Sequence, residues 1–410
     1  MPPQVDIGRL RNDIEALGRI GRTPEGGVSR PSFSRADLEA RTWLKDRILE
    51  AGLLYRVDGA GNIFGCLEGA GKAVMAGSHI DTVLQGGMFD GAAGVCIALE
   101  CLRRIREENL PVCRPLQVAA FTDEEGNLVG DFLGSRAFTG RLDREAVLAG
   151  KTLLGPPLKD ILESAGFTVD GVLQAHKERP EIEAFLELHI EQGTVLETEE
   201  IPIGVVEAFS GKQYRWCSFA GVAAHGGTTP LELRRDAFLG LADFALRGTR
   251  HVAANHYGSL VTIGKAVLHP GSFSVVPGQT DFSLDFRSLS AEALENMEKE
   301  LLALALDVGK ARGLEFVSRI VDRTDPVAVS PRITGLLEEE CRTLGYPSMR
   351  LSSGAGHDAQ ILAGLCDSGL IFIPCADGLS HAPGESASWD DIEKGANLML
   401  AALVRLAGAS

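Results

Sequence analysis

Four short apolar runs constrain the fold of this chain more than any other feature. They read KAVMAGSHI (72–80), PLQVAAF (115–121), AFLELHI (184–190) and GLIFIPC (369–375). Runs of this length predict buried strands. Between the first two lies GAAGVCIALECLRRIREEN (91–109), which has the small, apolar start and charged end of a helix. Strand, helix and strand in that order predict a parallel sheet covered by helices, and therefore the α/β class.

The middle of the chain has a different pattern. Three segments alternate polar and apolar residues more openly, as strands with one solvated face do: 214–224, 259–268 and 281–289. Helical patterns near 233–246 and 291–312 separate them. This order predicts a small α+β domain inserted into the α/β domain. We therefore expect a first domain made of residues 1–209 and 327–410, and a second domain of residues 210–326.

Charge and hydropathy exclude several classes of protein. The chain has 40 Lys and Arg against 56 Asp and Glu, a formal net charge of −16. This balance argues against nucleic acid or an anionic membrane as a partner, because both attract a basic face. No apolar run approaches the ~20 residues of a membrane span. The polar N-terminus and the eight scattered cysteines, without a Cys-x-x-Cys pair, predict a cytoplasmic protein.

Histidines and carboxylates gather where the expected strands end. In GSHIDTVLQGGMFDGAAG, His79 and Asp81 are two residues apart and therefore on one side of an extended chain. Asp90 follows in a glycine-rich loop, where the backbone can approach a ligand closely. The acidic triplet 123–125 comes directly after the second run. Neighbouring carboxylates repel each other, so their burial requires a nearby cation.

Four more histidines have similar surroundings. His189 and Glu191 end the third run, in AFLELHIEQG, and His381 follows the fourth, in GLSHAPGE. His357 lies in the glycine-rich SSGAGHDAQ, and His225 lies in GVAAHGGTTP at the start of the second domain. The remaining histidines lack such settings and are expected to be structural or surface residues: His176, His251, His256 and His269.

These positions supply enough imidazole and carboxylate ligands for two divalent ions: His79, Asp90, Glu125, His189 and His381. In α/β sheets, ligand sites collect at the carboxyl ends of the strands. A set without thiolates suits zinc, manganese, cobalt or nickel. Two ions ~3.5–4 Å apart need a shared ligand, and Asp90 on its loop is the natural bridge.

The combined pattern resembles the M20 family of di-metal amidohydrolases and peptidases over residues 5–405. HIEQG, AHGGTTP, SGAGHDAQ and GLSHAPGE resemble the branch that acts on ureido substrates, including N-carbamoyl-L-amino acid hydrolases, 3-ureidopropionases, allantoate amidohydrolases and ureidoglycolate amidohydrolases. The resemblance implies a metallopeptidase-like α/β/α catalytic domain. It also implies a ferredoxin-like inserted domain that serves as lid and dimerisation platform, and hence a homodimer.

The resemblance implies a role for each metal-site residue. His79, Asp90 and His189 would hold one ion, and Asp90 would bridge to a second ion held by Glu125 and His381. Zinc is the first expectation for both ions. Asp81 would orient His79.

The resemblance also implies how the substrate is bound and attacked. Glu124 would be the general base, taking a proton from a metal-bridging water and passing it to the leaving amine. His225 would reach the site of the partner subunit and stabilise the oxyanion. Arg287 would clamp the substrate carboxylate. The expected substrate-binding residues are Gln192, Ser274, Arg287, Gly356 and His357.

One departure from the branch concerns the substrate. Its members carry asparagine where SFSVVPG has Ser274. That asparagine helps to bind the substrate carboxylate, and the shorter serine leaves room for a different or bulkier acid end.

The leading hypothesis is hydrolysis of the C–N bond of a ureido group, with an N-carbamoyl-L-amino acid giving the amino acid, carbon dioxide and ammonia. Allantoate or ureidoglycolate is the alternative substrate. A peptidase or N-acyl amino acid deacylase is a third reading, and His189 argues against it because peptidase branches place an acid there. A non-enzymatic binding protein would have lost a ligand or the base, and none is lost.

Overall fold

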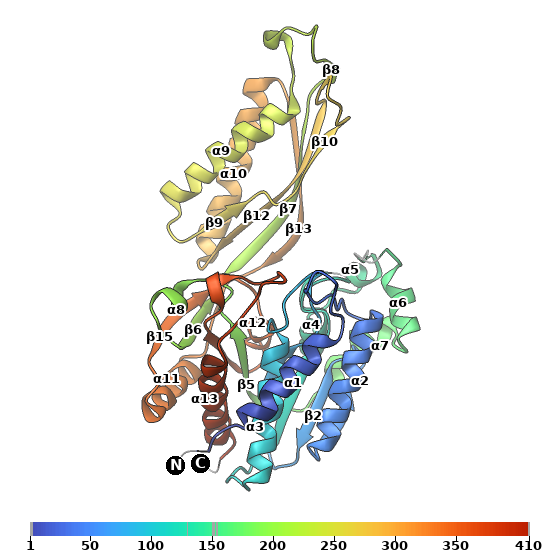
Figure 1. Cartoon of the computed structure of the whole chain (residues 1–410). Helices are drawn as coiled ribbons and strands as arrows, with labels where there is room; N and C mark the ends of the chain where they lie inside the picture. Colours follow the sequence, from blue (N-terminus) through green and yellow to red (C-terminus); the bar gives the residue numbers. More distant parts are fainter. Residues whose placement is uncertain (1–2, 129, 150–151, 153–154, 409–410) are drawn as a thin grey trace. The chain divides into compact units, whose positions relative to one another are not determined.

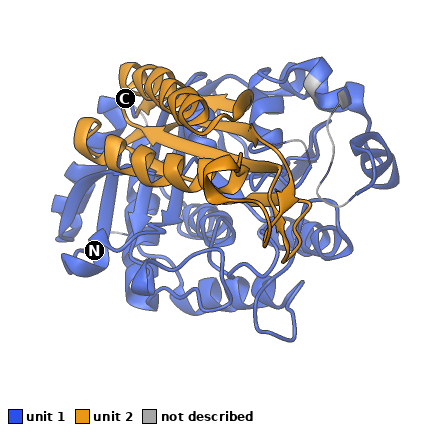
Figure 2. Ribbon diagram, turned by 90° about the horizontal axis from the view of Figure 1, so that it is seen from above, with its two compact units in different colours: residues 1–207, 329–410 blue, residues 208–328 orange. Residues whose placement is uncertain are grey.

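The computed structural model describes residues 3–128, 130–149, 152 and 155–408. The chain divides into two compact units (Figure 2). The first consists of Met1–Glu207 and Val329–Ser410, and the second is Ala208–Ala328. Among the described residues, none of the helices is long and apolar enough to cross a membrane.

The larger sheet contains nine strands within the described residues. They are β1 (Leu54–Val57), β2 (Ile63–Leu67), β3 (Ala73–His79), β4 (Leu116–Phe121), β5 (Ile182–Ile190), β6 (Ile203–Phe209), β14 (Val327–Ala328), β15 (Ser348–Ser353) and β16 (Asp367–Ile373). The order is β1-β2-β4-β3-β5-β16-β6-β14, and β15 pairs with β6. The four neighbours β4, β3, β5 and β16 are parallel. These are the four apolar runs, and the predicted parallel sheet is confirmed.

Helices cover the faces of this sheet (Figure 1). The core against β3, β4 and β5 is formed by α1 (Ile7–Arg19), α2 (Arg35–Glu50), α3 (Ala92–Glu107), α11 (Pro331–Leu344) and α13 (Trp389–Ala407). The other helices of the first unit are short. They are α4 (Leu133–Thr139), α5 (Arg144–Ala149), α6 (Leu158–Ser164), α7 (Val169–Gln174), η1 (Ala175–Glu178), α8 (Val195–Thr198), α12 (Asp358–Leu362) and η3 (Ala376–Gly378).

Strand alternation assigns His189 to one side of the sheet. On β5, Leu186 and Leu188 belong to the core shared with α3 and α13. The intervening side chains point to the opposite face. There the ring of Phe185 packs 5.8 Å from that of Phe121, which in turn lies 5.7 Å from Phe138 of α4. His189 therefore lies on the side of the sheet that α4 and α12 cover.

The second unit follows a β-α-β-β-α-β order. Its elements are β7 (Gly211–Ala220), β8 (Ala224–His225), η2 (Leu231–Leu233), α9 (Ala237–Asn255), β9 (Leu260–Thr262), β10 (Ala266–His269), β11 (Val275–Val276), β12 (Gln279–Ser288), α10 (Ala291–Arg312) and β13 (Glu315–Thr324). The antiparallel order β10-β12-β7-β13, with β9 on β12, is that of ferredoxin-like domains. The helices α9 and α10 share an apolar core with the sheet.

The sequence located α10 accurately and misplaced α9. The expected helix near 233–246 begins later and extends further, because the carboxylate of Asp236 accepts the N–H groups of Phe238 and Leu239 and so caps α9. Residues 231–233 form a short 3-10 turn instead.

A fully buried arginine joins α1 to the end of β3. The Nε of Arg30 donates to the carbonyl of Ile80 at 2.6 Å, and its Nη1 donates to those of Leu17 and Ile20 at 2.9 and 2.7 Å. Burial lowers the pKa of Arg30 to about 10, although nearby carboxylates, Asp81 among them, oppose this shift. The guanidinium thereby fixes the backbone beside the last residue of β3.

We expect Arg30→Met to destabilise the protein by about 3 kcal/mol or more, because three carbonyls each lose a hydrogen bond from the buried guanidinium. Urea unfolding followed by circular dichroism measures this loss. Arg19→Met is the matched control: the Arg19 side chain is 71% exposed and lies 3.7 Å from Glu15. Its loss should stay below about 0.5 kcal/mol. Equal losses in the two variants would contradict the role assigned to Arg30.

Candidate metal centre

The five expected metal ligands all come together in the first unit. His79 is the last residue of β3, Glu125 follows β4, and His189 lies near the end of β5. His381 lies in the loop after β16, and Asp90 lies just before α3. The parallel strands β3, β4, β5 and β16 bring their carboxyl ends to one edge of the sheet, which is why residues far apart in the sequence meet there.

Asp90 lies at the centre of the group. Its Oδ1 is 3.4 Å from Nε2 of His79 and 3.2 Å from Nε2 of His189. Its Oδ2 is 3.4 Å from Nε2 of His381, and that nitrogen is 3.3 Å from Oε1 of Glu125. The structure thus forms two three-residue groups that share Asp90, each with its ligand atoms within 4.8 Å of one another. This is the arrangement needed to hold two cations with one bridging carboxylate.

The tautomers of two imidazoles follow from their hydrogen bonds. Nδ1 of His79 lies 3.0 Å from the carbonyl of Asp81, and Nδ1 of His189 lies 2.8 Å from the carbonyl of Ile190. A carbonyl can only accept, so in the neutral ring the proton is on Nδ1 and the lone pair is on Nε2. Nε2 of each ring lies near Asp90, and Nε2 of His189 also accepts the N–H of Gly91 at 3.0 Å.

Asp81 contacts His79 mainly through its backbone. Its carboxylate Oδ1 is 3.9 Å from Nδ1 of His79, further than the carbonyl. The carboxylate instead accepts the backbone N–H groups of Glu124 and Glu125, at 3.4 and 3.3 Å. Asp81 therefore connects the end of β3 to the loop that carries both glutamates.

The Asp90 loop is held in place by residues that the sequence analysis did not select. Glu385 accepts the N–H groups of Phe89 and Asp90 at 2.8 and 3.1 Å. Ser380 donates to Oδ2 of Asp90 at 2.7 Å. Gly91 has φ +61°, and a Cβ there would lie 2.3 Å from the His79 ring, so only glycine fits. The glutamate that ends the motif GLSHAPGE is Glu385, and its place in this motif was the sequence signal that could have identified it.

A further buried carboxylate, that of Glu187, connects the elements that carry the metal-site residues. Glu187 of β5 accepts from Ser78 Oγ at 2.5 Å and from the N–H of Ala359 at 2.8 Å. It thereby ties β5 to β3 and to the start of α12, where His357 lies. A charge inside an apolar strand was the signal that could have identified Glu187, because a buried charge requires partners.

The electrostatics favour a cation. Burial and neighbouring carboxylates raise the pKa of Glu124 well above its usual range and that of Glu125 to about 8. A hydrogen bond to Asp90 raises the pKa of His381 to about 9. Carboxylates crowded into a site of low polarity are stabilised in the ionised form by a metal ion. The donor set therefore fits divalent cations.

Glu124 is placed close to both groups. It is 8% exposed, and its Oε2 lies 3.6 Å from Nε2 of His79. It also forms a third close group with His79 and Glu125.

Three of the expected substrate-binding residues lie in the first unit. Gln192 donates from Nε2 to Oδ2 of Asp90 at 2.6 Å, while its Oε1 is buried and accepts no hydrogen bond from the described residues. His357 is buried, and its ring centroid is 4.6 Å from that of His189. Burial lowers the pKa of His357 well below its usual range, so the ring is neutral. At Gly356 a Cβ would lie 2.5 Å from the Phe132 ring.

The remaining expected residues lie in the second unit. His225 of β8 pairs with Val275 of β11, and the N–H of Gly226 donates to the carbonyl of Ser274 at 2.6 Å. The N–H of Gly227 donates to Nδ1 of His225 at 3.1 Å, so in the neutral ring Nε2 carries the proton. His225 and Ser274 therefore lie side by side at the small two-stranded antiparallel sheet that β8 forms with β11.

Arg287 lies on β12, with the side chain partly exposed. Its Nη2 donates to Asp285 Oδ2 at 3.0 Å and to Tyr214 Oη at 3.1 Å. The guanidinium is thus held in one position on the sheet.

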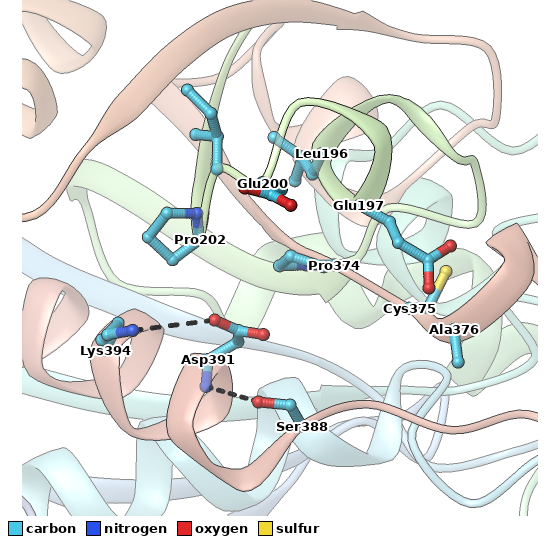
Figure 3. A pocket seen from close by; sticks show the side chains of 11 residues that line it. Leu196, Glu197, Glu200, Pro202, Pro374, Cys375, Ala376, Ser388, Asp391 and Lys394 are labelled. Carbon is cyan, nitrogen blue, oxygen red and sulfur yellow. Dashed lines mark hydrogen bonds and ion pairs between the residues drawn. The ribbon is translucent and has the colours of Figure 1, made fainter.

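Hydrogen bonds to neighbouring elements hold the loop that carries His381. The N–H of Asp377 donates to Glu197 of α8 at 2.9 Å, and Ser388 caps α13 by accepting the N–H of Asp391. A pocket of about 310 Å³ lies between these elements (Figure 3). Its described lining includes no candidate metal ligand, so it is distinct from the metal centre.

An α/β/α unit that gathers imidazoles and carboxylates at the carboxyl edge of its sheet has the architecture of a metal-dependent hydrolase. Residues 75–405 match the family described as peptidase family M20/M25/M40, and the chain belongs to this family. Enzymes of this family are metal-dependent, in agreement with the ligand groups found here. The predicted family and fold class are confirmed.

Known proteins resemble the chain over nearly its full length. It is 35% identical over 403 residues to an N-carbamoyl-L-amino acid amidohydrolase of Geobacillus stearothermophilus, covering 97% of this chain and 98% of that protein. It is 32% identical over 417 residues to a ureidoglycolate hydrolase of Oryza sativa subsp. japonica, covering 99% and 86%. The crystal structure of a hydantoinase/carbamoylase family amidase from Burkholderia multivorans matches with TM-score 0.88 and 33% identity, covering 99% of each chain.

We expect metal binding to release protons. A hydrogen bond to Asp90 raises the pKa of His381 to about 9, so this ring carries a proton at pH 7, and burial raises the pKa of the neighbouring Glu125 to about 8. A metal ion displaces the proton of His381, so affinity at this position should fall about tenfold or more per pH unit below pH 8.

Calorimetric titration with zinc in buffers of different ionisation enthalpy measures the release. At least one proton should leave at pH 7, and the His381→Gln variant should release fewer protons than the wild type. Zinc binding without any proton release would contradict these protonation states.

Proposed function

We propose that this protein is a di-metal hydrolase that cleaves the C–N bond of a ureido group, with an N-carbamoyl-L-amino acid as substrate. The products would be the amino acid, carbon dioxide and ammonia. The observation that carries the proposal is the pair of ligand groups that share Asp90. The likeness to the Geobacillus stearothermophilus enzyme, which extends over 97% of this chain, supports the substrate class.

Five residues would hold the two ions: His79, Asp90, Glu125, His189 and His381. Zinc is the first expectation, and the same donors also suit manganese, cobalt or nickel. When bound, the ions would supply Lewis acidity at the ureido oxygen and lower the pKa of the attacking water. The protein contributes ligands in fixed positions, and Gly91 leaves room for the His79 ring.

Glu124 would be the general base. Its carboxylate would take a proton from the attacking water and give that proton to the leaving nitrogen. The C–N bond then breaks with a neutral amine as the leaving group, not its anion. The position of its Oε2, 3.6 Å from Nε2 of His79 and beside both ligand groups, supports this role.

His225 would stabilise the oxyanion. Its Nε2–H is the free donor of the ring, because Nδ1 already accepts from Gly227. A donor of this kind stabilises the negative charge that develops on the ureido oxygen. We further propose that it acts in the active site of a partner subunit, with the second unit as dimerisation platform and lid.

The acid end of the substrate would be bound by Arg287 and Ser274. Arg287 is held by Asp285 and Tyr214 and can present its guanidinium to a carboxylate. Ser274 offers a hydroxyl in place of a longer amide, beside the β8–β11 pair that carries His225. Gln192, with its buried unpaired Oε1, would accept an N–H of the ureido group, and Gly356 and His357 would line the same side of the centre.

Ureidoglycolate or allantoate is the second candidate substrate. The likeness to the rice ureidoglycolate hydrolase favours it, since it extends over 99% of this chain. Both substrates have a ureido group and a carboxylate, so the same residues would act.

A substrate panel tests the proposal. Metal-loaded enzyme is incubated with N-carbamoyl-L-amino acids, 3-ureidopropionate, allantoate, ureidoglycolate and N-acetyl amino acids, and ammonia and free amine are measured. Ammonia from carbamoyl compounds supports the leading substrate. Turnover of N-acetyl compounds alone would overturn the ureido assignment and keep the metal centre.

We expect Glu124→Gln to lower kcat on the best substrate by about 10²–10⁴-fold, because the amide cannot accept the proton. Bound metal, measured by mass spectrometry, should change little, since Glu124 is not among the five proposed ligands. Glu199→Gln on the exposed end of α8 is the matched control and should retain full activity. Full activity of Glu124→Gln would exclude its role as base.

Mixed dimers test whether His225 acts across subunits. Glu124→Gln and His225→Ala homodimers should each be inactive. After unfolding and refolding together, heterodimers should regain one working site, and activity should rise to about a quarter of wild type. Each variant refolded alone is the control. A strict monomer by analytical ultracentrifugation, or no recovery on mixing, would remove the partner's histidine from the mechanism.

A further inference from the structure

The helices α9 and α10 of the second unit approach each other closely. Gly248 of α9 faces Leu301 of α10, and a Cβ there would be in ordinary van der Waals contact with Cδ2 of that leucine at 3.4 Å. About one turn later on α9, His251 faces Glu300 of α10, and His256 follows at the end of α9. Three side chains that can bind metal thus meet where the two helices touch.

Two imidazoles of this group point at a single carboxylate oxygen. Nε2 of His251 is 2.7 Å from Oε2 of Glu300, and Nε2 of His256 is 2.6 Å from the same atom. The ligand atoms of the three residues all lie within 4.8 Å of one another. Hydrogen bonds from both rings hold the pKa of Glu300 below its usual range, so the carboxylate is ionised at neutral pH.

The surroundings provide what an open metal site needs. Asn255 places its side-chain amide 3.2 Å from Nδ1 of His251. A metal ion at Nε2 moves the ring proton to Nδ1, so the Asn255 amide would turn, give up its 2.9 Å hydrogen bond to the carbonyl of His251 and accept the Nδ1–H through its oxygen. The side chains of His251 and Glu300 are 35% and 42% exposed, so water can reach a fourth position.

We propose that His251, His256 and Glu300 form a divalent-metal site whose ligands all lie in the second unit. Two imidazoles and a carboxylate, with water in the open position, are an established zinc ligand set. Zinc–ligand distances of about 2.0–2.1 Å place tetrahedral ligand atoms roughly 3.3 Å apart. The exposed Glu300 side chain can move so that its distances to the two imidazoles, now 2.7 and 2.6 Å, lengthen to this spacing. Cobalt and nickel suit the same donors.

A bound ion would cross-link the end of α9 to the middle of α10. The same ion would hold the turn after α9 that leads into β9, because the carbonyl of His256 accepts the N–H of Ser259. The proposal does not depend on the reaction catalysed in the first unit.

The test counts metal ions per chain at graded free zinc, by equilibrium dialysis and mass spectrometry of the full-length protein. Wild type should bind one ion more than His256→Ala and one more than Glu300→Gln. His269→Ala is the matched control: it removes the other histidine–carboxylate pair of this unit, with Nε2 3.0 Å from Asp281, which no described residue completes to a triad. This control should keep the wild-type count.

Two further readouts separate the site from the catalytic centre. With saturating cobalt, the difference in visible absorption between wild type and His256→Ala should show the intense bands of tetrahedral coordination. Catalytic activity should be equal in the two proteins. Equal activity with one ion fewer in His256→Ala would place the lost ion outside the catalytic centre, whatever reaction that centre catalyses.

The proposal is overturned if wild type, His256→Ala and Glu300→Gln bind the same number of ions. It is also overturned if His269→Ala loses an ion as they do, because binding would then be adventitious. Circular dichroism in the presence of a chelator confirms that each variant is folded. His251→Ala replaces any variant that is not.

Discussion

The mutual repulsion of carboxylates buried at one edge of a sheet is the constraint on which the first unit depends. Asp90, Glu124 and Glu125 lie within a few ångströms of one another among histidines, at the ends of parallel strands. Such a group is tolerable only with positive charge inside it. The backbone donors, the glycine beside His79 and the acids Glu187 and Glu385 all serve to keep these side chains in position for that charge.

The sequence predicted the parallel sheet and the convergence of the ligands, because both follow from the spacing of apolar residues and from the order of strands and helices along the chain. A carboxylate directly after an apolar strand must lie at the carboxyl edge, whatever the remaining fold. The supporting contacts could not be predicted in this way. Ser380 and Glu385 reach Asp90 across nearly 300 residues of sequence, and no local pattern reports such a distance. The contact of His79 with the Asp81 carbonyl, rather than with the carboxylate, depends on the turn after β3.

In the proposed function, each of the two units supplies a different kind of chemical group. The first unit presents lone pairs and carboxylates, and the second presents donors: the Nε2–H of His225 and the guanidinium of Arg287. Hydrogen bonds within each unit determine which ring nitrogen carries the proton. In the proposed function, the five ligands of the catalytic ions come from the first unit, and the oxyanion donor and the carboxylate clamp come from the second.

The pairing of β8 with β11, which places His225 beside Ser274, bears on how enzymes of this family change their substrates. The frame is a backbone hydrogen bond from Gly226 to the carbonyl of residue 274, and it does not depend on which side chain residue 274 carries. In the proposed function, substitution at residue 274 would alter the acid end that is accepted while His225 keeps its place. Selection could then adjust substrate range one side chain at a time, and laboratory evolution could begin from the same position.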